Sequence, residues 1–293
     1  MSLLAVGLVI VAAFCHASWN LLAKRSSGGV AFVWLIQVTG ALLYAPIALA
    51  FLIENPPEFT PSLFAAVAAS AMAHMSYFMS LQRGYRGGDL SLVYPVARGT
   101  GPTLATVGAI LIYGERPSAL GLLGAALVIT GVLFISMSSR RQRENHTDDQ
   151  RHARLYGLKW GIITGLFIAT YSMIDSFAVA QLSIFPFFYL WFSDVTRSIL
   201  LAPAALRRLD AVKHELRVHR LEVVGVGILS PLSYLLVLFA MSFTPLSYVA
   251  PAREMSILIG TIMGARLLSE EGGRRRVLAA VLIVGGVVAL ALG

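Results

Sequence analysis

Charged side chains inside long apolar stretches are the residues of this sequence that could carry chemistry. Six ionisable residues lie well within such stretches: Arg98, Asp175, Asp194, Arg197, Arg253 and Glu254. A charge inside a bilayer costs about 3 kcal/mol on insertion scales, so each is a functional candidate by default. A guanidinium favours a carboxylate or phosphate partner, and a desolvated carboxyl group can exchange a proton. These residue types indicate binding of an anionic group, proton coupling, or both.

The acidic residues differ in the partners that the sequence offers them. Asp194 and Arg197 stand three positions apart on one helical face, a spacing that predicts a structural ion pair; a functional pair is the alternative. Asp175 and Glu254 have no basic residue three or four positions away and are candidates for proton coupling. Arg253 adjoins Glu254, but neighbours on a regular helix point about 100° apart.

The alternative for Asp175 and Glu254 is an ion pair with Arg98 or Arg253 across helices, which would make them structural. Both arginines are candidates to bind the substrate, and we expect the larger contribution from Arg98 if Glu254 or another acid already satisfies Arg253.

Prolines near both arginines predict interrupted helices. Pro95 and Pro102 flank Arg98, and Pro251 precedes Arg253, so we expect helix breaks at these three prolines. Interrupted segments at corresponding places in two halves of a chain are a pointer to a transport site; a packing kink is the alternative.

Several polar and aromatic residues complete the candidate substrate-binding set. His16 and His74 have no ligand-like spacing to each other or to the single cysteine, Cys15, so we expect no metal site. They are interpreted as histidines that line a pathway or are satisfied within the protein. The full predicted substrate-binding set is His16, Asn20, His74, Tyr94, Arg98, Tyr171 and Arg253.

The composition places these residues in a membrane. Of the 293 residues, 57% are hydrophobic and 13% charged, and the mean hydropathy is +0.75. Soluble proteins carry about 25% charged residues, so the chain is predicted to be a polytopic membrane protein. The net charge of +8 resides mainly in loops, where it sets membrane orientation rather than binding nucleic acid.

Ten apolar runs are long enough to cross the bilayer, which needs roughly 20 residues. Because the backbone must satisfy its own hydrogen bonds there, we expect an all-α fold. The predicted spans are 3–22, 30–53, 62–81, 90–113, 118–136, 155–176, 184–206, 221–243, 246–268 and 277–292.

A polar tract divides the spans five and five. We therefore predict a first repeat at 1–137, a polar linker at 138–154 and a second repeat at 155–293. A shift of 155 residues aligns Arg98 with Arg253 and Glu115 with Glu270. Five spans per half make the two repeats inverted, as in many transporters.

Basic residues accumulate in the loops on one side, including Lys24, Arg25, Arg83 and Arg86. The positive-inside rule places that side and the linker in the cytoplasm, with both termini outside.

Three motifs resemble the drug/metabolite transporter superfamily, specifically its EamA-type ten-helix members. They are His16-Ala-Ser-Trp-Asn20, Tyr94-Pro-Val-Ala-Arg98-Gly99 with Pro102, and Gly114-Glu115-Arg116-Pro117-Ser118. The resemblance implies a secondary carrier, often an exporter of amino acids or small metabolites, that works by alternating access. It also implies cytoplasmic termini, contrary to the loop charges. The second half departs from the motifs: Ile257 stands where Pro102 would repeat, and Ser269-Glu270-Glu271 replaces the Gly-Glu-Arg turn.

The sequence thus predicts a multi-pass protein of the cell (inner) membrane that is a secondary active transporter, with export of a small polar metabolite favoured. No enzymatic activity, cofactor or nucleic-acid partner is expected, and protons are the candidate coupling ion. The chain is expected to be a monomer or a homodimer in the lipid bilayer. The alternative is a polytopic membrane enzyme or flippase that acts on a lipid-linked substrate.

Overall fold

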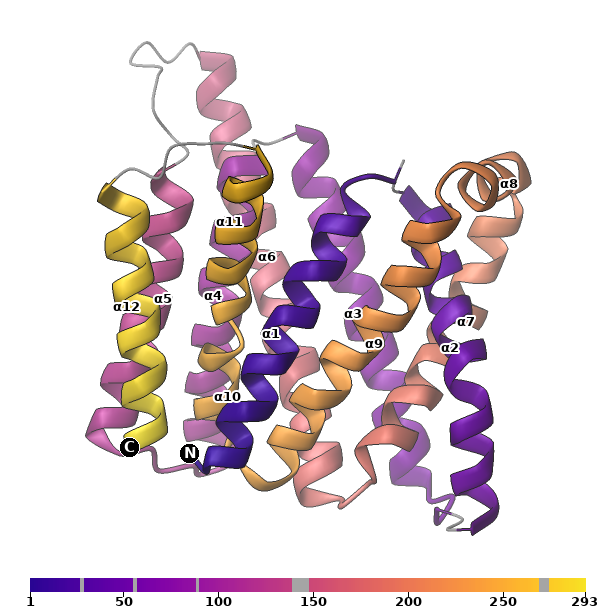
Figure 1. The fold of residues 1–293 in the computed structure, drawn as a ribbon, viewed down its shortest axis with the longest axis horizontal. Coiled ribbons are helices and arrows are strands. Elements are labelled where there is room, and N and C mark those ends of the chain that lie inside the picture. The colour runs from indigo at the N-terminus through magenta and orange to yellow at the C-terminus, as the bar shows by residue number, and fades with distance from the viewer. Residues whose placement is uncertain (27–28, 55–56, 88–89, 139–147, 269–273) are drawn as a thin grey trace.

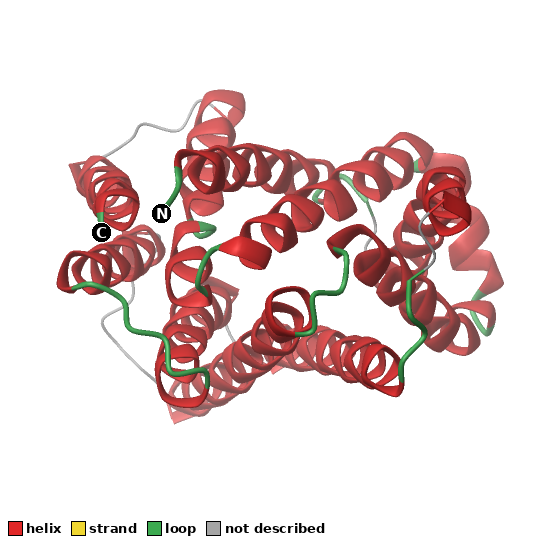
Figure 2. Cartoon of the chain, turned by 90° about the horizontal axis from the view of Figure 1, so that it is seen from below, coloured by secondary structure: helices red, strands yellow, loops and turns green. Residues whose placement is uncertain are grey.

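A computed structural model describes residues 1–293 apart from 27–28, 55–56, 88–89, 139–147 and 269–273. The described residues are almost entirely helical, and none of them lies in a strand (Figure 2). The first half contains the helices α1 (Leu3–Ala23), α2 (Gly29–Glu54), α3 (Pro61–Gly87), α4 (Leu90–Ile112) and α5 (Ala119–Ser138). The second half contains α6 (Asp148–Ser176), the π-helix η1 (Phe177–Gln181), α7 (Pro186–Leu206), α8 (Leu209–Val218), α9 (Arg220–Phe243), α10 (Leu246–Ala252), α11 (Met255–Leu268) and α12 (Arg274–Leu292).

Five helical stretches of the described chain are long and apolar enough to cross a membrane. They are Leu3–Ala23, Gly29–Glu54, Pro61–Gly87, His152–Gln181 and Arg220–Phe243, with shorter apolar helices at Ala119–Phe134 and Val277–Leu292. Many large apolar side chains on them face outward, for example Leu42 and Leu221. An apolar exterior of this extent belongs against lipid, so the chain is a polytopic, all-helical membrane protein that contacts the bilayer.

The helices pack in pairs that join the two halves of the chain. α5 lies against α12 at one end of the molecule and α2 against α7 at the other (Figure 1). Between them, α1 packs on α9, α3 on α6, and α4 on both α6 and α10. The two chain ends lie at the same face of the helices (Figures 1 and 2).

The predicted helix breaks at Pro95 and Pro102 are wrong, because α4 continues through both prolines. A proline removes only one backbone donor, here the N–H that would bond the Ser91 or the Arg98 carbonyl, and the rest of the helix can continue. Threonine hydroxyls form further bonds to other carbonyls of α4. The Thr100 hydroxyl donates to the Val96 carbonyl at 2.7 Å, and the Thr103 hydroxyl donates to the Gly99 carbonyl at 2.7 Å.

The helix is interrupted directly after Pro251, as predicted, because α10 ends at Ala252 and α11 begins at Met255. The expected span 246–268 is therefore two helices with Arg253 and Glu254 in the break. The loop expected after Leu206 contains the short helix α8, and residues 148–154 of the expected linker continue α6.

Candidate functional site

The centre of the site is an ion pair that joins the two halves of the chain. Arg98 on α4 places its Nη2 atom 2.9 Å from the Glu254 Oε2 atom, and the Glu254 side chain is fully buried. The same Arg98 nitrogen lies 3.5 Å from the Ser256 Oγ atom at the start of α11. α4 and α10 are in contact, so this ion pair ties the unbroken helix to the broken one.

Arg253 lacks a comparable partner. Its Nε atom is 3.7 Å from the Glu254 Oε1 atom, a long contact. Its Nε and Nη2 atoms are buried without a hydrogen-bond partner among the described residues. The guanidinium lies over the Tyr171 ring with its Cζ atom 5.7 Å from the ring centroid, within cation–π range. A buried guanidinium with unused donors is suited to bind a carboxylate or phosphate, whose oxygens accept its hydrogen bonds.

The structure shows which arginine pairs more closely with Glu254. The sequence left Arg98 and Arg253 as alternatives, and the closer partner of Glu254 is Arg98. The argument that Arg253 and Glu254 point apart assumed a regular helix. Both residues lie in the turn between α10 and α11, where the side chains of neighbouring residues can approach each other.

Aromatic rings line the same region. His74 stacks on Tyr171 with ring centroids 3.9 Å apart, and Tyr77 and Tyr234 meet Tyr171 edge-on at 5.9 and 6.2 Å. The His74 Nδ1 atom is 3.0 Å from the Ser70 carbonyl oxygen, which can only accept. The proton of a neutral His74 ring is therefore assigned to Nδ1, and Nε2 is left as an acceptor. These four residues, His74, Tyr77, Tyr171 and Tyr234, form what we call the aromatic cluster.

Asp175 lies beside the aromatic cluster and is held by phenols rather than by a cation. The Tyr189 hydroxyl donates to its Oδ1 atom at 2.6 Å, and the Tyr234 hydroxyl donates to its Oδ2 atom. The Asp175 side chain is fully buried and forms no ion pair within the described part of the chain. Tyr234 thus links Asp175 to the ring that lies under Arg253.

The remaining candidates for substrate binding, His16, Asn20 and Tyr94, lie on α1 and α4. The partly exposed His16 packs edge-on against Trp19 at 4.8 Å, and the Asn20 amide donates to the His16 carbonyl at 2.8 Å within α1. Asn20 is therefore engaged in the last turns of its own helix. Tyr94 is partly exposed and precedes Arg98 by one helical turn, on the same face of α4.

Asp194 and Arg197 form an ion pair within α7, and both side chains are largely buried. The hydroxyl of Ser198 donates to the Asp194 carbonyl at 2.8 Å, and the indole of Trp34 on α2 donates to the Ser198 carbonyl at 3.0 Å. The indole of Trp34 thereby joins α2 to α7 one turn beyond Asp194.

The Gly-Glu-Arg turn positions the broken helix. Glu115 accepts the backbone N–H of Leu246 at 2.8 Å and that of Ser247 at 2.9 Å, one with each carboxylate oxygen. A carboxylate at this place caps the start of α10 and opposes its positive dipole end. Because α10 ends at the residue before Arg253, Glu115 fixes the helix that presents Arg253 and Glu254 to the site.

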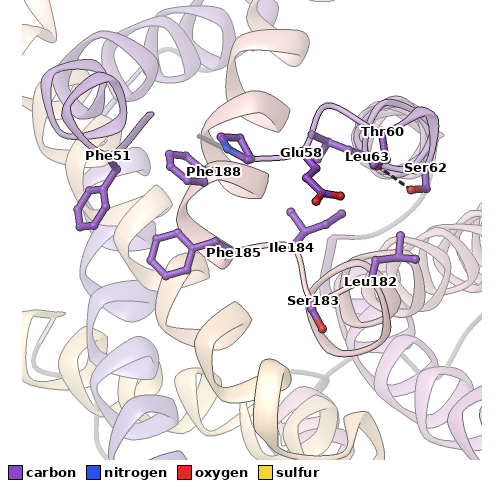
Figure 3. Close-up of a pocket in the computed structure, with 11 residues that line it drawn as sticks. Phe51, Glu58, Thr60, Ser62, Leu63, Leu182, Ser183, Ile184, Phe185 and Phe188 are labelled. Carbon is purple, nitrogen blue, oxygen red and sulfur yellow. Dashed lines mark hydrogen bonds between the residues drawn. The ribbon is translucent and has the colours of Figure 1, made fainter. Parts of the chain in front are cut away.

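A separate cavity of about 610 Å³ opens at the face where the chain ends lie (Figure 3). Phe51, Phe185 and Phe188 form its apolar side, and Glu58 points toward Ile184 across from them. Ser183, at its rim, has a φ of 53°, in the left-handed region that non-glycine residues rarely adopt. None of the predicted site residues lines this cavity.

Sequence reasoning missed Tyr77, Tyr189, Tyr234 and the capping role of Glu115. Tyrosines in spans suggest interface anchors, and only the fold shows that two of them converge on Asp175. The position of Glu115 in the loop before α5 marks it as a residue that could cap a helix. The helix that it caps begins at Leu246, 131 positions away, and only the fold reveals it.

Comparison with solved structures supports the fold. A structure described only as "Crystal structure of protein" matches with a TM-score of 0.73 and 16% sequence identity, covering 98% of this chain and 96% of that chain. At this identity the likeness shows the architecture alone. Comparison with curated proteins found no match.

A family model matches the chain twice, over residues 3–137 and 155–292. The two matches cover nearly the whole sequence, and their boundaries fall beside the polar tract that separates the two halves. The chain belongs to the EamA-like transporter family.

Proposed function

We propose that this protein is a secondary active transporter that moves a small polar solute with an anionic group by alternating access. Its ten spans would form two inverted repeats, at 1–137 and 155–293, with α10 and α11 together as one span. The repeated family match supports this division. The packing supports it as well. In the proposed repeats α6 corresponds to α1 and α9 corresponds to α3, so the contact of α1 with α9 is matched by the contact of α6 with α3.

The buried Arg253 carries the proposal for the substrate. Its Nε and Nη2 atoms have no hydrogen-bond partner in the described part of the protein, and buried donors without an acceptor are unfavourable. A substrate carboxylate or phosphate would supply the missing acceptors. His74, Tyr77 and Tyr171 lie around this position and would contact the body of the solute, together with the partly exposed His16 and Tyr94.

Transport kinetics in proteoliposomes test this assignment. Counterflow with a panel of labelled amino acids, carboxylates and phosphate esters first identifies a solute. Arg253→Lys keeps the charge but loses the planar fork, so we expect KM to rise about tenfold, the size of a 1.4 kcal/mol loss. Arg98→Lys is the matched control and should change protein stability more than KM. A KM rise confined to Arg98→Lys would overturn the assignment.

We further propose that Asp175 is the proton-coupling acid. Glu254 is engaged by Arg98, whereas Asp175 contacts only neutral donors and can change charge without breaking an ion pair. Asp175→Asn retains oxygen and shape, so it should abolish accumulation against a gradient and preserve solute exchange. Glu254→Gln serves as the control, and folded molecules of this variant should still accumulate solute. Normal accumulation by Asp175→Asn would exclude the coupling role.

The orientation follows from the loop charges. We propose that both termini lie outside the inner membrane and that the linker is cytoplasmic, with export as the favoured direction. Single cysteines at Ser2→Cys and Thr147→Cys in a Cys15→Ser background provide the test. An impermeant thiol reagent should label only the Ser2→Cys variant in intact cells, and labelling of only the other would reverse the orientation.

The family consists of transporters, which argues against an enzyme acting on a lipid-linked substrate. No feature of the described residues favours a flippase over a solute carrier, so we retain the solute carrier as the proposal.

A further inference from the structure

The short helix α8 is a feature that neither the transport site nor the spanning helices explain. Its ten residues extend about 15 Å, half of what a membrane crossing requires. It connects the end of α7 to the start of α9 and lies at the face opposite the two chain ends (Figure 1). Its axis is turned away from the direction of both neighbours (Figure 1).

One side of α8 packs on the protein and leaves an apolar edge uncovered. Val212 and Glu215 are buried, and α8 contacts α2, α7 and α9. Leu209 and Leu216 stand seven residues apart, hence on one face, and remain 49% and 48% exposed. Two half-exposed leucines at the end of membrane helices lie where the apolar part of a bilayer begins.

The exposed polar side of α8 is predominantly basic. Lys213 and Arg217 stand four residues apart and are both exposed. Three more exposed arginines flank the helix, namely Arg207, Arg208 and Arg220. The acidic residues of this segment are Asp210, the partly exposed Glu222 and the buried Glu215, so the outward-facing charge is positive.

We propose that α8 is an interfacial helix that binds anionic phospholipids. Lys213 and Arg217 would bind the phosphate groups of the lipid headgroups, and Leu209 and Leu216 would enter the upper acyl region. An apolar edge beside basic side chains is the arrangement that holds helices in the plane of a membrane interface, and basic juxtamembrane clusters select anionic lipids. Because α8 joins the end of α7 to the start of α9, it lies at the level of the membrane interface. This position favours lipid over a soluble protein partner.

Lipid-dependent melting of the purified full-length protein tests this inference without any transport assay. Added phosphatidylglycerol should raise the melting temperature of the parent protein by several degrees, and phosphatidylcholine should not. Lys213→Gln/Arg217→Gln should lose at least half of that rise. The matched control, Arg86→Gln/Lys159→Gln, removes two exposed basic residues from α3 and α6 and should retain the full rise.

Two additional measurements separate the sources of the phosphate and guard against misfolding. Native mass spectrometry counts bound phosphatidylglycerol directly, and Lys213→Gln/Arg217→Gln should carry fewer adducts than the control at equal folded fraction. Soluble glycerol phosphate should leave the melting temperature unchanged. An equal rise with glycerol phosphate or phosphatidylcholine would overturn the proposal, as would an undiminished phosphatidylglycerol response in the α8 variant.

Discussion

The two arginine-bearing segments, α4 and α10–α11, occupy corresponding places in the proposed repeats but are built differently. α4 is continuous through two prolines, whereas the second segment breaks at Arg253–Glu254. α4 also packs closely on α6: a Cβ atom at Gly165 would lie 1.8 Å from the Thr100 Oγ1 atom and 3.1 Å from the Gly101 backbone nitrogen. In the second segment, by contrast, a Cβ atom at Gly260 of α11 would lie 3.8 Å from the Ala17 Cβ atom of α1, an ordinary contact distance.

The difference assigns separate tasks to the two arginines. Arg98 is held in a tightly packed helix and pairs with Glu254, so its charge is used within the protein. Arg253 sits where the helix is interrupted, and its Nε and Nη2 atoms have no hydrogen-bond partner among the described residues. Duplicated segments have thereby become unequal, with a fixed charge on one side and an available charge on the other.

The largest effect is expected when the fixed charge is removed. Arg98→Met leaves Glu254 buried with only the long contact to Arg253, and breaking a buried pair costs about 3–5 kcal/mol. Arg253→Met should cost clearly less, because no short ion pair is lost. Melting of both variants in detergent measures the difference, and equal losses would contradict the distinction between the two arginines.

A smaller effect should come from filling the close contact of α4. Gly165→Ala forces Thr100 and the backbone at Gly101 to move, an overpacking that costs about 2 kcal/mol. Gly260→Ala introduces only an ordinary contact and gains helix propensity, so it should be neutral or stabilising by up to about 1 kcal/mol. Denaturation of the two variants checks the contrast, which fails if Gly260→Ala is the more harmful change.

The smallest effect concerns the support of the broken segment. Glu115→Ala removes the cap from α10 and should destabilise the protein by about 1–2 kcal/mol. Glu115→Gln keeps one acceptor and should lose less than the alanine variant. Glu58→Ala removes an exposed carboxylate with no capping bond and is the neutral control. Amide exchange at Leu246 and Ser247 should accelerate in Glu115→Ala, and unchanged exchange there would argue against the cap.

Much of the fold was predictable, because membrane spans leave a local signal. Apolar runs of about 20 residues predicted α1, α2, α4 and α9 within a few residues of their ends. The prediction was wrong at Pro95 and Pro102, since each proline removes a single backbone hydrogen bond and α4 continues with its other ones. Helix α8 was missed because its ten residues resemble a charged loop.

The site was less predictable, because its contacts join residues far apart in the chain. The sequence identified Arg98, Asp175, Arg253 and Glu254 as buried charges, and the structure brings Arg98, Arg253 and Glu254 together. Which arginine pairs with Glu254 depends on the turn at the end of α10, and no local pattern specifies that turn. The phenols that hold Asp175 come from α7 and α9, so only the helix packing reveals them.

The Arg98–Glu254 pair also bears on how a duplicated chain diverges. Each of the two residues comes from a different half, and each would be a buried, uncompensated charge if its half stood alone. The two halves are therefore complementary at this contact rather than interchangeable. Replacing one member of the pair by a neutral residue leaves the other half with an unbalanced buried charge, whereas replacing both does not.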